Sequence, residues 1–377
     1  MNYFYSHSRG VLVIHELAGN PINHLLHIDE TGNLPLYEFD VDTIYKDLHT
    51  LFAFMKDIRQ LIDNQRLVID GALGTLLEDR IDKNSSIHPQ NSKLWSGKVL
   101  LEQPQLIEQV HEEYIASGAD MVISSTYQLS YPSLVKYEGL NNQEISTLWT
   151  KSIDVANRAI QKSGKPVYLV GSVGPYATFL ADGSEYSGDY GQVSGEQIFN
   201  YYLPILQFLS TNSKVDIIGI ETIPNFKEFK IVLNLLKKLC HKPFYISCNF
   251  VNSEKLPDGT CIYKVINYLT MKLQKTHQLN KNFLGIGLNC IDYLTIHDII
   301  KQIPSSLNIL VYPNLGYTYD LQTKKYQFIP NPHQFEVELK KWLTHNNVRA
   351  IGGCCLTTPK TIELISKVLQ EYEEKTN

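Results

Sequence analysis

Three of the six cysteines in this 377-residue sequence lie at the ends of two short apolar runs: Cys290, Cys354 and Cys355. Three thiolates hold zinc at about 2.3 Å and leave one position of a tetrahedron open, as in catalytic zinc sites. No CxxC pair is present to supply the usual structural pattern. Two alternatives stay open, because buried cysteine is often a small hydrophobic residue and Cys354 and Cys355 could be a redox pair. We interpret the other three as structural: Cys240, Cys248 and Cys261.

Two carboxylates also stand at the ends of apolar runs. Glu221 follows the run Ile-Ile-Gly-Ile, and Asp70 ends the run Arg-Leu-Val-Ile-Asp. A carboxylate at the end of a buried strand requires a polar partner, and it can accept hydrogen bonds from the ammonium group of a substrate. A salt bridge at the rim or a helix cap would explain the same residues, especially Asp70.

A long loop adds aromatic residues to this set. It begins with the segment 171–180 and continues through a region rich in Gly, Asp and Tyr to Gly195. Long ordered loops at a catalytic face are typical of lids and binding loops. Tyr176 and Phe179, together with Tyr127, could face a cation, or they could be packing residues.

The elements that must position these residues are short apolar runs, which alternate with helical patterns of three- and four-residue spacing. Eight such runs predict a (β/α)8 TIM barrel with its active site at the C-terminal ends of the strands. A doubly wound open sheet is the alternative, but it normally stops near six strands and no GxGxxG follows the first run. The eight runs are 66–70, 120–126, 167–173, 216–222, 244–250, 283–290, 308–314 and 349–355.

Residues 1–62 lie outside this alternation, so we expect an N-terminal extension (1–62) followed by the barrel (63–377). One helical face in the extension is apolar, and such a helix is expected to cover the bottom of the barrel. A regulatory or dimerising arm is the alternative. The residues of that face are Leu48, Leu51, Phe52, Met55, Ile58 and Ile62.

The bulk composition excludes several functional classes. A net charge of −5 and the absence of a basic run argue against a nucleic-acid partner or an anionic membrane. The N-terminus does not resemble a secretory signal, and no apolar stretch approaches the ~20 residues that span a bilayer. We therefore expect a cytoplasmic protein with mostly reduced cysteines. The sequence does not give the oligomeric state.

Six motifs in order resemble the homocysteine S-methyltransferase family, from about residue 66 to 370. The resemblance implies that Cys290, Cys354 and Cys355 bind zinc. It also implies a homocysteine pocket drawn from Asp70, Gly71, Thr126, Tyr127 and Glu221. Two features depart from the family pattern, namely the extension of about 62 residues and the polar strand end at Asn249. The motifs are DGALGT (70–75), ISSTYQ (123–128), GSVGPY (171–176), GIET (219–222), GLNC (287–290) and GGCC (352–355).

The family members most similar in these motifs are fungal and plant enzymes that use S-methylmethionine or S-adenosylmethionine. A free thiol has a pKa near 8.5, and binding as the fourth zinc ligand would deprotonate it. The resulting hypothesis is methionine synthesis, in which a zinc-bound homocysteine thiolate attacks the methyl group of a sulfonium donor. Which donor is used stays open. A catalytically silent zinc- or metabolite-binding regulatory barrel is the alternative.

Overall fold

The computed structural model describes residues 57–376, apart from 240, 316, 321–324 and 329–331, together with two short strands near the N-terminus. These strands, β1 (Tyr3–Ser6) and β2 (Val11–Ile14), pair in antiparallel orientation. The chain divides into two compact units, residues 1–55 and 56–377. Within the described residues, no helix has both the length and the apolar character needed to cross a membrane.

Eight parallel strands form the sheet of the second unit, in the order β3-β12-β9-β8-β7-β6-β5-β4. A parallel bridge between Ile69 and Met121 joins the two edge strands, so the sheet closes on itself. This confirms the predicted (β/α)8 barrel and excludes the open sheet. The strands are β3 (Leu67–Val68), β4 (Met121–Ile123), β5 (Tyr168–Val173), β6 (Ile217–Ile223), β7 (Phe244–Cys248), β8 (Phe283–Asp292), β9 (Ile309–Asn314) and β12 (Val348–Ile351).

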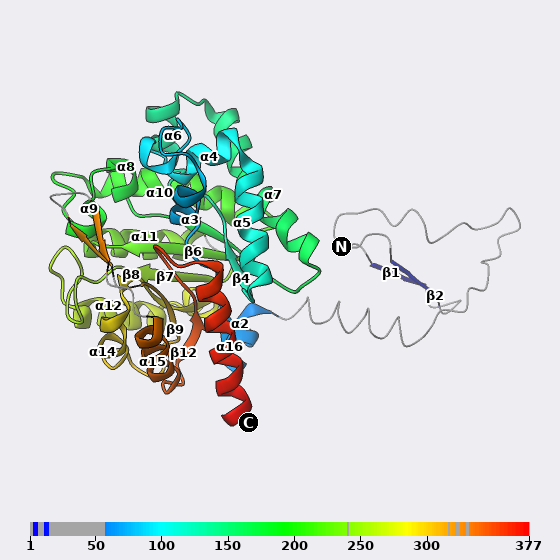
Figure 1. Ribbon diagram of the computed structural model, residues 1–377, viewed down its shortest axis with the longest axis vertical. Helices are drawn as coiled ribbons and strands as arrows, with labels where there is room; N and C mark the ends of the chain where they lie inside the picture. The colour runs from blue at the N-terminus through cyan, green and yellow to red at the C-terminus, as the bar shows by residue number, and fades with distance from the viewer. Residues whose placement is uncertain are drawn as a thin grey trace, which may run out of the picture. The chain divides into compact units, whose positions relative to one another are not determined.

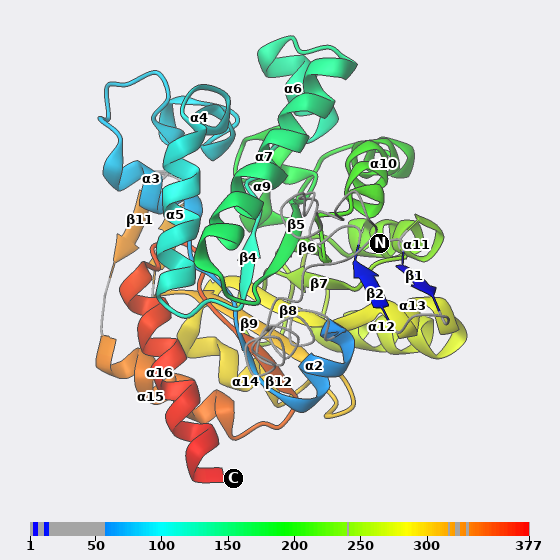
Figure 2. The same ribbon diagram turned by 90° about the vertical axis from the view of Figure 1, so that its right-hand side faces the viewer.

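Helices surround these strands (Figures 1 and 2). They are α2 (Ile58–Asn64), α3 (Leu73–Arg80), α4 (Ser96–Glu102), α5 (Pro104–Ala116), α6 (Tyr131–Glu138), α7 (Asn142–Ser163), α8 (Ala177–Leu180), α9 (Ser184–Ser187), α10 (Gly195–Thr211), α11 (Phe226–Leu239), α12 (Ile262–Lys275), α13 (His277–Asn282), α14 (Ile296–Ile300), α15 (Pro332–Leu343) and α16 (Pro359–Thr376). Two 3-10 turns, Pro89–Asn91 and Tyr293–Thr295, complete the set.

The longest helix, α7, shows how local sequence fixes these boundaries. Asn141 caps its first turn through the backbone N–H of Glu144, while the Glu144 carboxylate accepts from the N–H of Asn141. This capping box satisfies two N–H groups that the helix leaves unpaired. Gly164 then ends the helix in the left-handed conformation that glycine adopts without steric cost.

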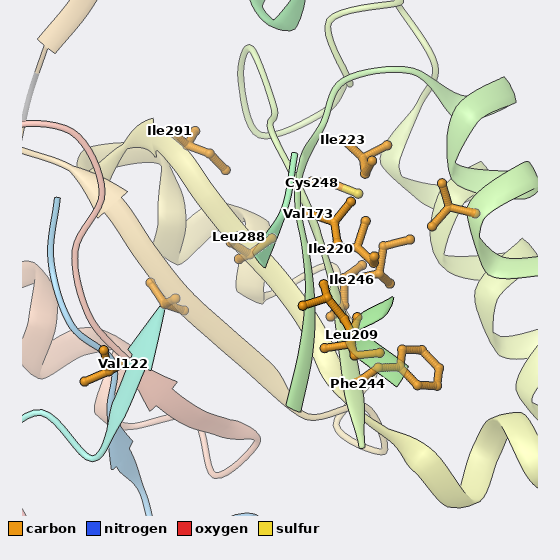
Figure 3. Close-up of a cluster of buried hydrophobic side chains, with 14 of the residues drawn as sticks. Val122, Val173, Leu209, Ile220, Ile223, Phe244, Ile246, Cys248, Leu288 and Ile291 are labelled. Carbon is orange, nitrogen blue, oxygen red and sulfur yellow. The ribbon is translucent and has the colours of Figure 1, made fainter. Parts of the chain in front are cut away.

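The apolar core has two layers. The larger one lies between the strands and the surrounding helices, and Figure 3 shows part of it, in which Ile220 of β6, Ile246 of β7 and Leu209 of α10 lie together. The smaller layer fills the barrel interior and includes Ile58 and Ile62 of α2. Helix α2 therefore packs against the apolar interior of the barrel.

Two observations bear on the expected extension and on the strand count. The described helix starts at Ile58, and the earlier part of the apolar face expected over Leu48–Ile62 lies outside the described residues. The division into 1–62 and 63–377 stays a prediction. A hairpin of β10 (Tyr317–Asp320) and β11 (Lys325–Phe328), inserted between β9 and α15, was not expected from the sequence.

Candidate metal centre

Three thiols converge at the C-terminal end of the barrel. The Sγ atoms of Cys290, Cys354 and Cys355 all lie within 4.8 Å of one another. The Sγ of Cys290 is 3.1 Å from that of Cys354 and 3.6 Å from that of Cys355. A disulfide requires about 2.05 Å, so these are free thiols. Among the described residues, no fourth His, Cys, Asp or Glu belongs to the cluster.

The donor set fits a soft divalent cation. Sulfur ligands at about 2.3 Å around tetrahedral zinc stand about 3.8 Å apart, which is close to the longer Sγ–Sγ distance. Sulfur ligands select zinc over hard cations such as magnesium and calcium. Without a cation, hydrogen bonds with Cys354 and Cys355, together with burial, raise the pKa of Cys290 well above its usual value. Three thiolates in this position therefore require a compensating positive charge.

Strand irregularities set the direction of Cys290. The residue has φ of 57°, and Thr222 on β6 has φ of 60°, values that place both in the left-handed region. Register shifts interrupt the pairing of β8 with β9 and of β6 with β7 at these points. Such bulges turn a side chain away from its regular direction. Non-glycine residues in the left-handed region carry backbone strain, which contacts elsewhere must offset.

Asn289 supplies such contacts. Its Oδ1 accepts from the backbone N–H of Thr222 at 3.0 Å, and its Nδ2 donates to Thr222 Oγ1 at 2.7 Å. Ser247 of β7 donates its hydroxyl to the same Oδ1. The amide next to Cys290 thus ties the end of β8 to the end of β6.

A threonine after β12 positions Cys354. Thr357 Oγ1 donates to the carbonyl of Cys354 at 2.7 Å and accepts from the N–H of Ala72 at 3.0 Å. A Cβ added at Gly353 would come within 2.4 Å of the Thr357 side chain. A Cβ added at Gly352 would come within 2.6 Å of Ile69, so close packing requires both glycines before the cysteines.

The thiols form part of the wall of a cavity of about 460 Å³. This volume lies within the range of small-molecule sites. The described residues of its wall include all three cysteines, Glu221, Gly71, Tyr127 and a second carboxylate, Glu185. Most of residues 89–96 and four of residues 181–186 also line the cavity.

Glu221 is buried and held in place at one side of this cavity. The Ser172 hydroxyl donates to Oε2, and the Tyr245 hydroxyl donates to Oε1 at 3.0 Å. Burial raises the pKa of Glu221, and the hydrogen bonds from Ser172 and Tyr245 partly oppose that shift. A carboxylate in this position can pair with a substrate ammonium group.

The structure separates the other predicted pocket residues into two groups. Gly71 and Tyr127 line the cavity, whereas Asp70 and Thr126 are absent from its described wall. Thr126 donates to the carbonyl of Ser172, and Asp70 accepts from the N–H of Ile123 at 2.9 Å. The second oxygen of Asp70, Oδ1, is buried without a hydrogen-bond partner among the described residues.

The loop of residues 171–195 contributes to the site through a residue that sequence reasoning missed. Glu185 of α9 lines the cavity, whereas Tyr176 and Phe179 do not. Those two rings pack edge-to-face, and the Lys136 ammonium lies 4.8 Å from the centroid of Phe179. The Asn249 amide, which departs from the family pattern, donates to the carbonyl of Glu185 at 2.9 Å. The sequence feature that could have identified Glu185 is a carboxylate in a Gly-rich loop at the catalytic face.

The outlying cysteines take different positions. Cys248 is buried in β7, and burial raises its pKa well above the ordinary value. Cys261 is exposed and precedes α12. Cys240 lies outside the described residues. Neither Cys248 nor Cys261 joins the thiol cluster.

The fold and the site together define a class: (β/α)8 barrels with three cysteines at the C-terminal ends of their strands. A family model described as homocysteine S-methyltransferase matches residues 67–369. The chain therefore belongs to the homocysteine S-methyltransferase family, as the ordered motifs predicted.

Named relatives come from fungi, plants and bacteria. The chain is 30% identical over 327 residues to Homocysteine S-methyltransferase 2 of Saccharomyces cerevisiae, spanning 83% of this chain and 97% of that protein. It is 33% identical over 324 residues to Homocysteine S-methyltransferase 1 of Arabidopsis thaliana, spanning 80% and 93%. It also resembles the crystal structure of the metallated form of the homocysteine methyltransferase MmuM from Escherichia coli. That match has a TM-score of 0.68 and 31% identity, and covers 83% of this chain and 99% of that one.

Proposed function

We propose that this protein transfers a methyl group from a sulfonium donor, S-methylmethionine or S-adenosylmethionine, to the thiol of homocysteine, which yields methionine. One observation carries the proposal. Three thiols that lie within 4.8 Å of one another share the wall of one cavity with the buried carboxylate of Glu221. Homocysteine has a thiol at one end and an ammonium group at the other, and these two features of the cavity complement them.

The metal proposed for the cluster is zinc, held by Cys290, Cys354 and Cys355. When bound, zinc supplies a positive charge that lowers the pKa of a coordinated thiol, so that homocysteine is a thiolate at neutral pH. The cluster contains three protein ligands, which leaves room for one substrate ligand. A metallated form of the Escherichia coli relative is known, which supports a bound metal in this protein as well.

The protein side chains position the amino-acid end of homocysteine. Glu221 accepts hydrogen bonds from its ammonium group, while Ser172 and Tyr245 fix the carboxylate. Gly71 and Tyr127 form the adjacent wall. Asp70 and Thr126 are proposed to act from behind it, because their hydrogen bonds hold the backbone at Ile123 and Ser172.

The methyl transfer is a direct displacement. The substrate sulfur uses an electron pair to form a new S–CH3 bond, and the bond from that methyl to the donor sulfonium breaks. Those electrons neutralise the donor sulfur, which leaves as a thioether. The cavity contributes orientation and exclusion of water, which together can supply several kcal/mol of barrier reduction.

Metal analysis and methionine formation with each donor test the proposal. Cys354→Ala is expected to lose bound zinc and methyl transfer together while circular dichroism shows a folded barrel, because two thiols bind zinc weakly. Cys261→Ala, at an exposed position outside the cluster, is the matched control and should retain both. Full activity of the chelator-treated Cys354→Ala protein would contradict the proposal. Zinc binding by the wild type without methionine formation from either donor would favour the regulatory alternative.

A further inference from the structure

We infer that Glu185 binds the α-ammonium group of the methyl donor, so that donor and acceptor each have their own carboxylate in the cavity. The inference rests on the proposed function, because it assumes a methyl donor that is itself an amino acid. It adds a donor subsite formed by α9 to the homocysteine subsite at Glu221.

The first support is an unsatisfied acceptor. Glu185 Oε2 is buried and has no hydrogen-bond partner among the described residues, although the residue lines the cavity. An unpaired buried carboxylate oxygen is costly, so such a group in a binding cavity is expected to meet a donor on a ligand. By contrast, both oxygens of Glu221 already accept hydrogen bonds from the protein.

The second support is the rigid attachment of the loop that carries Glu185. The Asn249 amide donates to the carbonyl of Glu185, and the Asn225 amide donates to the carbonyl of Gly188 at 2.8 Å. Gly188 has φ of 66°, and a Cβ there would come within 2.3 Å of the backbone N of Asp258. The carboxylate is therefore presented by a packed loop, which lowers the entropic cost of binding a ligand.

The third support is the charge inventory of the cavity. Among its described wall residues the acidic side chains are Glu185 and Glu221, and the basic side chain is Lys93. Lys93 Nζ lies 3.5 Å from the carbonyl oxygen of Ala181, so this cation stands near the loop that carries Glu185. The amino-acid end of either donor presents one ammonium and one carboxylate, and Glu185 and Lys93 complement that pair.

The methyl donor has two positive charges, the sulfonium and the ammonium, and the chemistry of the reaction decides which one Glu185 contacts. The sulfonium loses its charge in the transition state, so a carboxylate held against it would stabilise the ground state more and slow the reaction. The ammonium keeps its charge throughout, so contact with it strengthens binding of ground state and transition state equally. Glu185 is therefore expected to act on the KM for the donor and to leave kcat nearly unchanged.

The test compares the zinc-loaded wild type with Glu185→Gln, which keeps the shape and removes the charge. Loss of one charge-assisted hydrogen bond is expected to weaken donor binding roughly ten- to hundredfold. Donor affinity is measured by calorimetry with S-methylmethionine in the absence of homocysteine, and KM values are measured for both substrates. We expect the KM for homocysteine and kcat to change less than threefold.

Two controls isolate the ammonium contact. Glu196→Gln, at an exposed position outside the cavity wall, should behave as wild type. Dimethylsulfoniopropionate is a sulfonium without an ammonium group, and as a competing ligand it should bind wild type and Glu185→Gln equally. Glu185→Asp retains the charge and should lose less donor affinity than Glu185→Gln, which provides a second readout if the latter folds poorly.

The outcomes separate this inference from the proposed function. Unchanged donor affinity in Glu185→Gln, or equal weakening of S-methylmethionine and dimethylsulfoniopropionate, overturns the ammonium contact while wild-type activity persists. A wild type that binds zinc but transfers no methyl group from either donor overturns the proposed function itself. Selective loss of S-methylmethionine binding supports the donor subsite.

Discussion

A buried carboxylate on α11, Glu228, secures both ends of the loop that carries Glu185. Its Oε1 accepts from the backbone N–H of Tyr176 at 2.6 Å and from the Tyr202 hydroxyl at 2.8 Å. Its Oε2 accepts from the Tyr190 hydroxyl at 2.6 Å. Burial raises the pKa of Glu228 from 4.5 to about 7, against the opposing effect of these hydrogen bonds.

This shift gives a signed prediction for stability. The unfolded chain releases the Glu228 proton near pH 4.5 and the folded chain near pH 7, so rising pH between these values favours unfolding. The contribution is fully present below pH 4.5 and is lost as pH rises through 7. The separation of the two pKa values corresponds to roughly 3 kcal/mol, most of which falls between pH 5 and pH 8.

Glu228→Gln removes the ionisation and keeps the geometry. The amide oxygen can accept from Tyr176 and Tyr202, and the amide nitrogen can donate to the Tyr190 oxygen. We therefore expect the free energy of unfolding of the variant, minus that of the wild type, to rise by roughly 2 to 3 kcal/mol from pH 5 to pH 8. Glu228→Ala instead leaves three donors unpaired and should lose stability at both pH values.

Urea denaturation of both proteins at pH 5 and pH 8, in one buffer system and with matched zinc content, measures this difference. Subtraction of the two proteins removes the contributions of all other titrating groups, provided that the m-values agree. If the difference in the free energy of unfolding stays constant with pH, or falls toward pH 8, it would refute the assigned ionisation of Glu228 and its role in holding the loop in place.

Two further predictions concern α5 and the Gly-Gly pair. His111 of α5 is fully buried, neither ring nitrogen has a hydrogen-bond partner among the described residues, and burial lowers its pKa to about 4. The folded state favours its neutral form. Urea denaturation should therefore show that the free energy of unfolding of the wild type, minus that of His111→Leu, falls by about 2 kcal/mol as pH drops from 7 to 5. A pH-independent difference would contradict this. Gly353→Ala forces Thr357 away from the Cys354 carbonyl, so competition with a zinc chelator should show metal affinity reduced roughly ten- to hundredfold. Unchanged affinity would show that Thr357 does not position the cysteine.

The barrel was predictable because its signal is repeated. Each strand is an apolar run buried on both faces, and eight runs in alternation with helices leave few other topologies. The thiol cluster was predictable for a related reason, since parallel strands place their C-terminal ends at one edge of the sheet. Cys290 lies near the end of β8 and Cys354 follows the end of β12, and the structure brings their sulfur atoms to 3.1 Å.

Other features had no periodic signal in the sequence. The Gly-, Asp- and Tyr-rich composition around Glu185 indicated a loop, but its direction depends on contacts with Asn225 and Asn249, far along the chain. Glu228 lies in a helical segment whose sequence pattern does not distinguish a buried glutamate from an exposed one. Its burial becomes evident only when Tyr190 and Tyr202 are placed around it. Contacts of this kind between distant segments leave no local pattern.

Asn289 shows how such a contact couples the two halves of the proposed site. It precedes Cys290, and its amide holds Thr222, the residue that follows Glu221. The strained conformations of Thr222 and Cys290 therefore depend on the same side chain. Because the proposed metal ligand Cys290 and the proposed ammonium-binding carboxylate flank this contact, one amide fixes the separation of the two proposed subsites. The ordered Gly-Ile-Glu-Thr and Gly-Leu-Asn-Cys segments thus act as one structural unit, although 67 residues separate Thr222 from Asn289.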